Sequence, residues 1–452
     1  NTAIGQNALT ENTTASNNTA VGASALAANT TGASNVAIGK DSLDSNTTGA
    51  NNVAVGMDAL QANTTTSNNT AVGTQALINN IAANNTALGN DALAANTTGA
   101  SNVAVGAAAL DANTTASNNT AVGKDALGAN TTGATNTAVG ARALTANTTG
   151  ANNVSIGYDS MYSNTTGHSN VAIGRDALVV NTTGYENTSV GKESMEANTD
   201  GYYNTALGMQ ALEDNTTGDL NTAIGWGTLK NNTTANTNTG IGSQALLTNT
   251  TGTENSGLGY ATLYSNTTAN YNTAAGHKSM YTNTTGTQNA TLGRESLYSN
   301  TTGGYNVAIG ANSLYSNTTA SNNTAVGYAA LNANTTGEDA VAIGSGALLA
   351  NTTGNNNIAI GYQALYDNTT GAYNTAIGWK SLFENTTANM NVAIGYDAMR
   401  DNTTGATNVA IGVEALANNT TAANNTAVGK DALTANTTGG DNTAVGYNAL
   451  TA

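Results

Sequence analysis

The chain has 452 residues, contains no Pro and no Cys, and is only 8% charged, against roughly 25% in an average soluble domain. It contains 11 Lys and Arg and 27 Asp and Glu, which gives a net charge of −16. This composition excludes disulfides, thiol nucleophiles and Cys-ligated metals, and it argues against nucleic acid or anionic membrane surfaces as partners. No apolar run approaches the ~18 residues of a membrane span, so we expect no membrane insertion.

A 17-residue repeat accounts for the whole chain. The segment Asn1–Gly5 returns as Asn35–Gly39 and, with one slip, as late as Asn442–Gly446. There are 26 complete units, one of them a residue short (69–84), and a final partial unit of 11 residues. Residues that return at a fixed period meet the same environment in every unit, which is typical of a solenoid. A disordered polar tract would not need an aliphatic residue at two fixed places in each unit. We predict one continuous all-β parallel β-solenoid over 1–452.

Within a unit, the elements follow from the residue types, counted from position 1 at Asn1. Position 1 is Asn in every unit except at Ala340. Positions 2–4, as in Thr2–Ile4, predict a strand, and positions 8–10 a second one. The Gly at position 5 recurs in all 27 units and indicates a corner with positive φ or close backbone approach. Asn-Thr-Thr at positions 12–14 is a candidate third strand. A rise of ~4.8 Å per coil gives a rod of roughly 125 Å.

Two apolar columns run through the repeat. Position 9 is Leu or Met in every unit and is expected to form the interior stripe. Position 4 is aliphatic, and Ala275 is its smallest occupant. Because side chains alternate along a strand, the small residue at position 3 and the residues at positions 2 and 4 face opposite sides. One side is the interior of the coil, and the other is a candidate interface with another chain.

The Asn-Val-Ala-Ile-Gly segments, among them Asn35–Gly39 and Asn170–Gly174, resemble the head repeats of YadA-like trimeric autotransporter adhesins. Segments such as Tyr328–Leu331 and Tyr362–Leu365, with Asn-Thr-Thr-Gly, are similar to repeats of phage and bacterial tail-fibre-like proteins. The first resemblance implies a left-handed β-roll, a homotrimer and display outside a bacterial cell. The present unit is longer than the usual adhesin repeat, and the neck, coiled-coil stalk and membrane anchor of that family are missing.

No catalytic constellation emerges from the sequence. His168 and His277 stand at drifting positions and are interpreted as surface variants. Position 7 carries many acids, such as Asp41 and Asp176, which leaves a calcium solenoid as an alternative. Several of these acids follow Lys or Arg and the glycine-rich calcium repeat is missing, which favours a solvated face of mixed charge. We expect no enzyme activity, no cofactor and no metal.

Aromatic residues gather in parts of the repeat. Position 10 holds a tyrosine in four successive units: Tyr264, Tyr281, Tyr298 and Tyr315. Such a row is a possible glycan platform, and the simpler interpretation is a surface ladder held by cross-strand pairing. An ice-binding threonine face is disfavoured, because the adjacent Thr13 and Thr14 point opposite ways.

The position-12 Asn matches the N-glycosylation acceptor pattern in 24 of 26 complete units. Asn80 and Asn198 keep the Asn without the acceptor threonine. This retention favours a buried amide ladder over a sugar site, so we predict little modification of the possible acceptors Asn29, Asn46, Asn96 and Asn113.

These features together indicate a structural extracellular fibre or adhesin shaft on a cell or virion surface. The expected partners are copies of the same chain, in a homotrimer or an end-to-end filament. The alternative is a module that binds glycans or cell surfaces through its tyrosine-bearing coils.

Overall fold

A computed structural model describes residues 1–451, which fall into two compact units that divide between Trp226 and Gly227. All regular secondary structure in residues 1–451 is β-strand. No helix in this range is long and apolar enough to cross a bilayer.

Every strand consists of three residues, at positions 2–4 of its repeat. The first unit contains β1 (Thr2–Ile4), β2 (Thr19–Val21), β3 (Val36–Ile38), β4 (Val53–Val55), β5 (Thr70–Val72), β6 (Thr86–Leu88), β7 (Val103–Val105), β8 (Thr120–Val122), β9 (Thr137–Val139), β10 (Val154–Ile156), β11 (Val171–Ile173), β12 (Thr188–Val190), β13 (Thr205–Leu207) and β14 (Thr222–Ile224). The second unit contains β15 (Thr239–Ile241), β16 (Ser256–Leu258), β17 (Thr273–Ala275), β18 (Ala290–Leu292), β19 (Val307–Ile309), β20 (Thr324–Val326), β21 (Val341–Ile343), β22 (Ile358–Ile360), β23 (Thr375–Ile377), β24 (Val392–Ile394), β25 (Val409–Ile411), β26 (Thr426–Val428) and β27 (Thr443–Val445).

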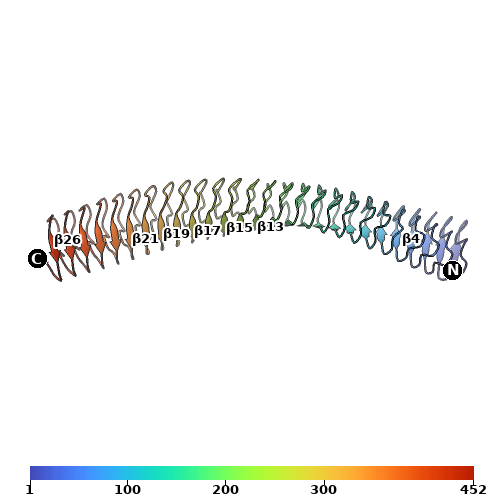
Figure 1. Ribbon diagram of the computed structural model, residues 1–452, viewed down its shortest axis with the longest axis horizontal. Helices are drawn as coiled ribbons and strands as arrows, with labels where there is room; N and C mark the ends of the chain where they lie inside the picture. The colour runs from blue at the N-terminus through green and yellow to red at the C-terminus, as the bar shows by residue number, and fades with distance from the viewer. Residues whose placement is uncertain (452) are drawn as a thin grey trace. The chain divides into compact units, whose positions relative to one another are not determined.

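In each unit, consecutive strands pair in parallel and in register, so that Val154 lies beside Val171 and Thr426 beside Thr443. Figure 1 shows each strand followed by a loop that returns the chain to the start of the next strand. The predicted parallel β-solenoid with a spacing of about 17 residues is confirmed.

The predicted strands at positions 8–10 and 12–14 are wrong, because both segments are turns and bends. The residues at positions 7 and 9 adopt left-handed φ, as at Ser24 (56°) and Leu26 (55°), so the backbone turns a corner at these positions. Left-handed φ costs a residue with a Cβ roughly 1–2 kcal/mol. Complete burial of the Leu26 side chain, worth about 1.5–3 kcal/mol, offsets this cost.

The glycine at position 5 has both predicted properties, a positive φ and a close approach to the backbone of the next coil. Gly22 has a φ of 139°, a region nearly restricted to glycine. A Cβ on Gly22 would lie 2.4 Å from the carbonyl oxygen of Gly39 in the next coil. Any side chain at this position would therefore separate adjacent coils.

The interior of each coil is thin and consists of small residues around the position-9 leucine. Leu43 is completely buried, as are Ala37 at position 3 and Ser42 at position 8. The larger Thr228 at position 8 is accommodated by a glycine at position 3 of the next coil, because a Cβ on Gly240 would lie 2.6 Å from Cγ2 of Thr228. The position-9 prediction of a core stripe is confirmed.

The short repeat 69–84 is accommodated in its corner, without loss of strand pairing. Thr70 still pairs with Thr86, although the two residues are 16 apart. Asn80 Nδ2 donates to the carbonyl oxygen of Ala82, two residues on, at 2.7 Å, whereas other repeats make this bond to the third residue on, as Asn29 does to Gly32. The missing residue therefore changes this corner and the hydrogen bonds of neighbouring asparagines, since Asn69 Nδ2 donates to Thr66 Oγ1 at 3.4 Å and Asn85 Nδ2 to Asn80 Oδ1 at 3.1 Å, while the strands stay paired.

Candidate functional site

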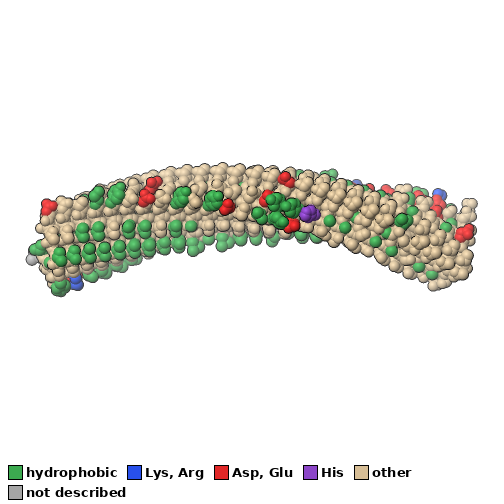
Figure 2. All heavy atoms as spheres, in the orientation of Figure 1, with side chains coloured by type: hydrophobic (Ala, Val, Ile, Leu, Met, Phe, Trp, Pro, Cys, Tyr) green, Lys and Arg blue, Asp and Glu red, His purple; other side chains and the backbone are tan. Residues whose placement is uncertain are grey.

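The most distinctive surface of each unit is the outward side of its strands, which we call the sheet face. It consists of the side chains at positions 2 and 4, while the alanine at position 3 points inward and is buried. Ile38 is 40% exposed and Ile309 is also 40% exposed. No strand contains a charged residue, and rows of hydrophobic side chains follow the strands of the second unit (Figure 2). The predicted second apolar side of the strand is therefore an exposed, uncharged sheet.

A hollow of about 280 Å³ interrupts the sheet face of the second unit at Ala275. It extends from Ala275 past Leu258 to Ile241, and Gly257 contributes to its lining without a side chain. In the strand register Ala275 lies between Leu258 and Leu292, which are both 55% exposed. The small side chain of Ala275 therefore opens the aliphatic column on one side of the hollow.

Asparagine at position 12 forms a buried ladder along the inside of the corner. Asn46 Nδ2 donates to Asn29 Oδ1 at 2.9 Å, and Asn29 Nδ2 donates to Asn12 Oδ1 at 3.1 Å. Each amide also donates to a backbone carbonyl three residues on, as from Asn46 to Gly49 at 3.0 Å. A side chain at this position must therefore supply two donors and one acceptor, which only an amide of this length provides.

Asparagine at position 1 forms a second ladder of a different kind. Its Oδ1 accepts the backbone N–H of the next asparagine, as from Asn35 to Asn18 at 2.9 Å. Its Nδ2 donates to a backbone carbonyl at position 15, as from Asn35 to Gly49 at 2.8 Å. Ala340 keeps the backbone half of this pattern, since its N–H donates to Asn323 Oδ1 at 2.9 Å.

The possible glycosylation sites Asn29, Asn46, Asn96 and Asn113 all belong to the position-12 ladder and are completely buried. The threonine that follows has its own role, because Thr97 Oγ1 donates to the carbonyl oxygen of Thr114 in the next coil at 3.0 Å. A sugar on Nδ2 would displace the two hydrogen bonds of the amide. This burial supports the prediction of little modification, which peptide mass spectrometry on natively purified protein would test; hexosamine on most of the four residues would contradict it.

The four tyrosines of position 10 stack on one another. The ring centroids of Tyr264 and Tyr281 are 4.9 Å apart, those of Tyr281 and Tyr298 5.3 Å, and those of Tyr298 and Tyr315 5.1 Å. Burial, followed by the neighbouring Tyr264 and Tyr298, raises the pKa of Tyr281. Neighbouring rings cover the inner ring faces, so the row presents mainly edges and hydroxyl groups. Its role as a glycan platform stays a prediction.

Four further aromatic stacks were not predicted from the sequence, and one of them pairs Tyr366 with Phe383 at 5.2 Å. One row stacks His168, Tyr185 and Tyr202 at 5.0 Å per step, and His277 stacks on Tyr260 at 5.3 Å. The fourth stack runs through Tyr362, Trp379 and Tyr396 at 6.0 and 4.8 Å. The signal was present in the sequence, because the members of each row occupy the same position of successive repeats.

The acids of position 7 mostly pair with the basic residue that precedes them. Arg175 Nε lies 2.8 Å from Asp176, and Lys192 Nζ lies 2.7 Å from Glu193. These pairs fit the predicted face of mixed charge.

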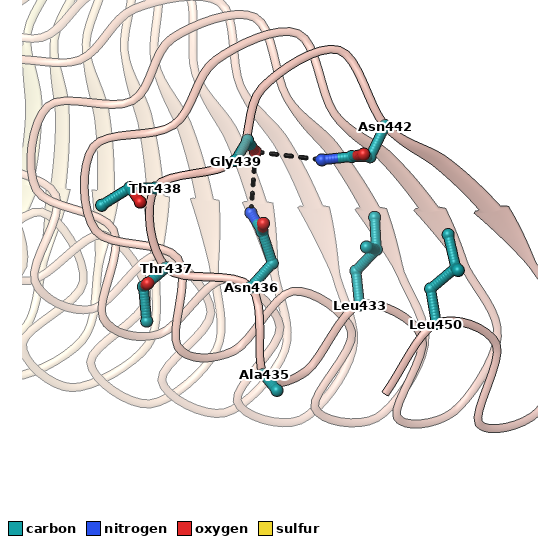
Figure 3. Close-up of a pocket in the computed structure, with 8 residues that line it drawn as sticks. All are labelled: Leu433, Ala435, Asn436, Thr437, Thr438, Gly439, Asn442 and Leu450. Atoms are coloured by element: carbon teal, nitrogen blue, oxygen red, sulfur yellow. Dashed lines mark hydrogen bonds between the residues drawn. The ribbon is translucent and has the colours of Figure 1, made fainter. Parts of the chain in front are cut away.

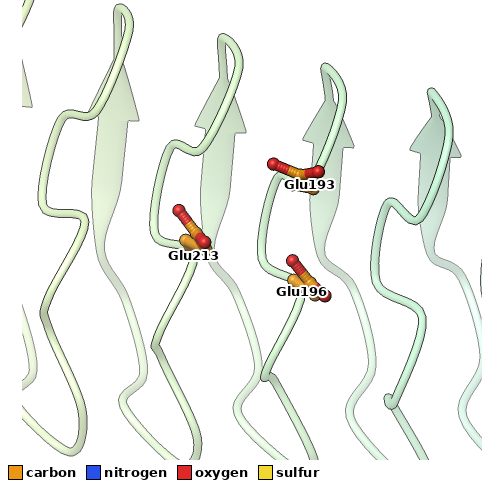
Figure 4. A group of neighbouring side chains, drawn as sticks. All are labelled: Glu193, Glu196 and Glu213. Carbon is orange, nitrogen blue, oxygen red and sulfur yellow. The ribbon is translucent and has the colours of Figure 1, made fainter.

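Three glutamates from two neighbouring coils, Glu193, Glu196 and Glu213, bring carboxylate oxygens within 4.8 Å of one another (Figure 4). Burial, followed by the charges of Glu193 and Glu213, raises the pKa of Glu196. The Lys192 ammonium group already pairs with Glu193, and the hydrogen bond between them lowers the pKa of Glu193. We assign no metal site to this cluster.

A second hollow lies beside Leu433 and Leu450, in the last described coils (Figure 3). Asn436 Nδ2 and Asn442 Nδ2 both donate to the carbonyl oxygen of Gly439, at 3.0 and 3.1 Å. Corresponding groups in earlier coils are covered by the coil that follows them, so we assign no ligand site to this hollow.

No protein-family model and no curated protein sequence matches this chain.

Proposed function

We propose that the chain is a structural shaft, a non-catalytic β-solenoid whose role is length and rigid display. The observation that carries this proposal is the repetition of the same buried contacts in coil after coil. Leu26 and Leu43 occupy equivalent interior places, and Asn29 and Asn46 continue the amide ladder between them. Each coil adds one strand spacing and rests only on its neighbours, an arrangement suited to a long, stiff element.

The sheet face is the surface through which copies of the chain associate side by side in this proposal. A three-residue strand is about 10 Å long and adds ~4.8 Å of width. The 14 strands of the first unit and the 13 strands of the second therefore present roughly 600–700 Å² each, or about 1,300 Å² per chain. A standard interface buries about 800 Å² per partner. The apolar, uncharged character of the face agrees with the composition of interface centres.

Trimeric assembly, left-handed coiling and display on a cell or virion surface complete the proposal. Their support is the resemblance of segments such as Asn35–Gly39 and Asn170–Gly174 to YadA-like heads, and of Tyr328–Leu331 to tail-fibre-like repeats.

Electron microscopy and mass photometry test the shaft. The expected result is straight rods whose mass is a multiple of 44.9 kDa, three copies in the preferred case. A flexible thread would overturn the shaft, and a monomer at micromolar concentration would overturn the association. Replacing Val341 and Ile343 with Thr and Lys on the sheet face should reduce association, whereas Asn418→Lys, at an exposed position on a corner away from the strands, should not.

Glycan binding through aromatic coils is the second candidate, and the observation in its favour is the gathering of aromatic rows in this chain. Binding on a glycan array that disappears when Tyr264, Tyr281, Tyr298 and Tyr315 are replaced by Ser would support it. Binding that survives these replacements would leave the rows as stabilising ladders.

A further inference from the structure

The position-4 column of the sheet face is nearly uniform in the second unit apart from one place. Position 4 is Val or Ile in every strand of that unit except β16, β17 and β18, which carry Leu258, Ala275 and Leu292. We call these three residues the triplet. Its two leucines are 55% exposed, against 40% for Ile309 in the next strand; both are register neighbours of Ala275, and Leu258 also lines the hollow.

A uniform apolar face specifies how far apart two copies lie but not how they are aligned along the strand stack. From β19 to β27, position 4 is Val or Ile throughout, while position 2 varies between Thr, Val and Ile, so a copy shifted by one coil would still meet the same column of β-branched side chains at position 4. Weakly specified registers of this kind slip easily. A feature that occurs once on the face is needed to distinguish one alignment from the others.

We propose that the triplet sets the axial register in which copies of this chain pack, with the triplet of one copy lying against the triplet of another. This inference rests on the proposed self-association through the sheet face. In the aligned arrangement, the leucine side chains on either side of Ala275 in each copy lean into the space that the Ala275 of the other copy leaves. Ser256 and Ala290 at position 2 are small and exposed, and they leave room for this movement.

An arrangement shifted by one or more coils is less favourable for two reasons. The leucines then face β-branched side chains such as Ile309, where overpacking is unfavourable. The hollows are left empty, and an unfilled apolar cavity is also unfavourable. Burial of a single leucine corresponds to at least about a tenfold difference in binding, so one triplet per chain is enough to select a register.

Cysteine cross-linking in the full chain tests the register, and the natural chain has no Cys to interfere. Single variants place a thiol at position 2: Thr273→Cys lies in the coil of Ala275, and Thr239→Cys and Val307→Cys lie two coils before and two coils after it. Each variant is cross-linked with a short bismaleimide, alone and in pairwise mixtures that are assembled together. The Thr273→Cys variant should cross-link to itself about tenfold better than to either of the others.

The same measurement is repeated after Ala275→Leu, which fills the hollow, and after Val326→Leu, a matched change on the same column outside the triplet. We expect the first variant to associate but to cross-link in all combinations within about twofold of one another, and the second to keep the tenfold preference. Association with equal yields in the unaltered chain would overturn the register and leave self-association standing. A preference that survives Ala275→Leu would also overturn it. A monomer that does not cross-link at all would overturn both proposals.

Discussion

The amide ladder of position 12 makes a prediction at Asn113, where a change of one atom removes two of three hydrogen bonds. Asn113 Nδ2 donates to Asn96 Oδ1 at 2.8 Å and to the carbonyl oxygen of Ala116 at 3.0 Å, and its Oδ1 accepts from Asn130 at 3.0 Å. Asn113→Asp keeps the shape but removes both donors, which leaves Asn96 Oδ1 unsatisfied at about 1–3 kcal/mol and adds the larger cost of a buried carboxylate oxygen without a donor. The Ala116 carbonyl oxygen keeps its hydrogen bond from Asn102. We expect the affected coils to lose about 2–6 kcal/mol of stability at neutral pH.

The pH dependence follows from the same contacts. The introduced carboxylate faces two oxygen atoms in a buried place, so its pKa in the folded chain is raised above the ordinary ~3.9. A carboxyl group with a raised folded pKa destabilises the fold increasingly as pH rises above its unfolded pKa. The penalty should therefore be smaller at pH 3.5 than at pH 7, since the protonated group can restore one donor.

Hydrogen exchange with mass spectrometry is the suitable assay, because each repeat of a solenoid rests only on its neighbours and the damage stays local. Peptides covering residues 96–130 should exchange at least about 30-fold faster at pH 7. The matched control is Asn118→Asp, an exposed asparagine at position 17 of the same coil. Equal protection in the two variants would refute the assignment of the ladder as a stabilising element.

Three further predictions concern the interior and its charges. Leu212→Asp places an unpaired charge beside completely buried neighbours and should unfold its coils. Gln210→Lys, beside Glu193, should leave the melting temperature nearly unchanged. Equal melting temperatures for the two variants would contradict the assignment of position 9 to the interior. Gly240→Ala should destabilise its coil by about 1–3 kcal/mol through contact with Thr228 Cγ2, and Thr228→Ala should restore most of that loss in urea unfolding. Glu196→Gln should raise the melting temperature at pH 7, because the pKa of this carboxyl group is raised by burial and by nearby acids, and this gain should vanish below about pH 4.

Periodicity predicted the strands, the corner glycine and the leucine column because each depends on a residue type that repeats without exception. It failed at positions 8–10, where an Ala-Leu pair gives no hint that Leu26 adopts a left-handed φ of 55°. The available signal was position 7, where Asp, Asn and Gly are common and tolerate that conformation. Gly227 and Gly346 stand at this position with φ of 61° and 66°. The acidic residues at position 7 were interpreted by their charge, although the left-handed backbone conformation is shared by the residues at this position and the charge is not.

The candidate surfaces were predicted in part. Alternation along the strand separated positions 2 and 4 from position 3, and Ala275 was visible as the smallest residue of its column. The exposure of the sheet face could not be derived, because a two-sided apolar strand is equally compatible with burial on both sides. The stacking of His168 on Tyr185 was missed because each histidine was considered alone and not by its place in the repeat.

The short repeat 69–84 shows that a repeat can lose one residue without interrupting the strand stack. The hydrogen bonds around Asn80 change while Thr70 and Thr86 stay paired. Because each coil rests only on its neighbours, whole units can also be added or removed. Each gain or loss of a unit changes the length of the strand stack by one step of ~4.8 Å. Natural selection can therefore adjust length in small increments, with the interior contacts of the remaining coils preserved.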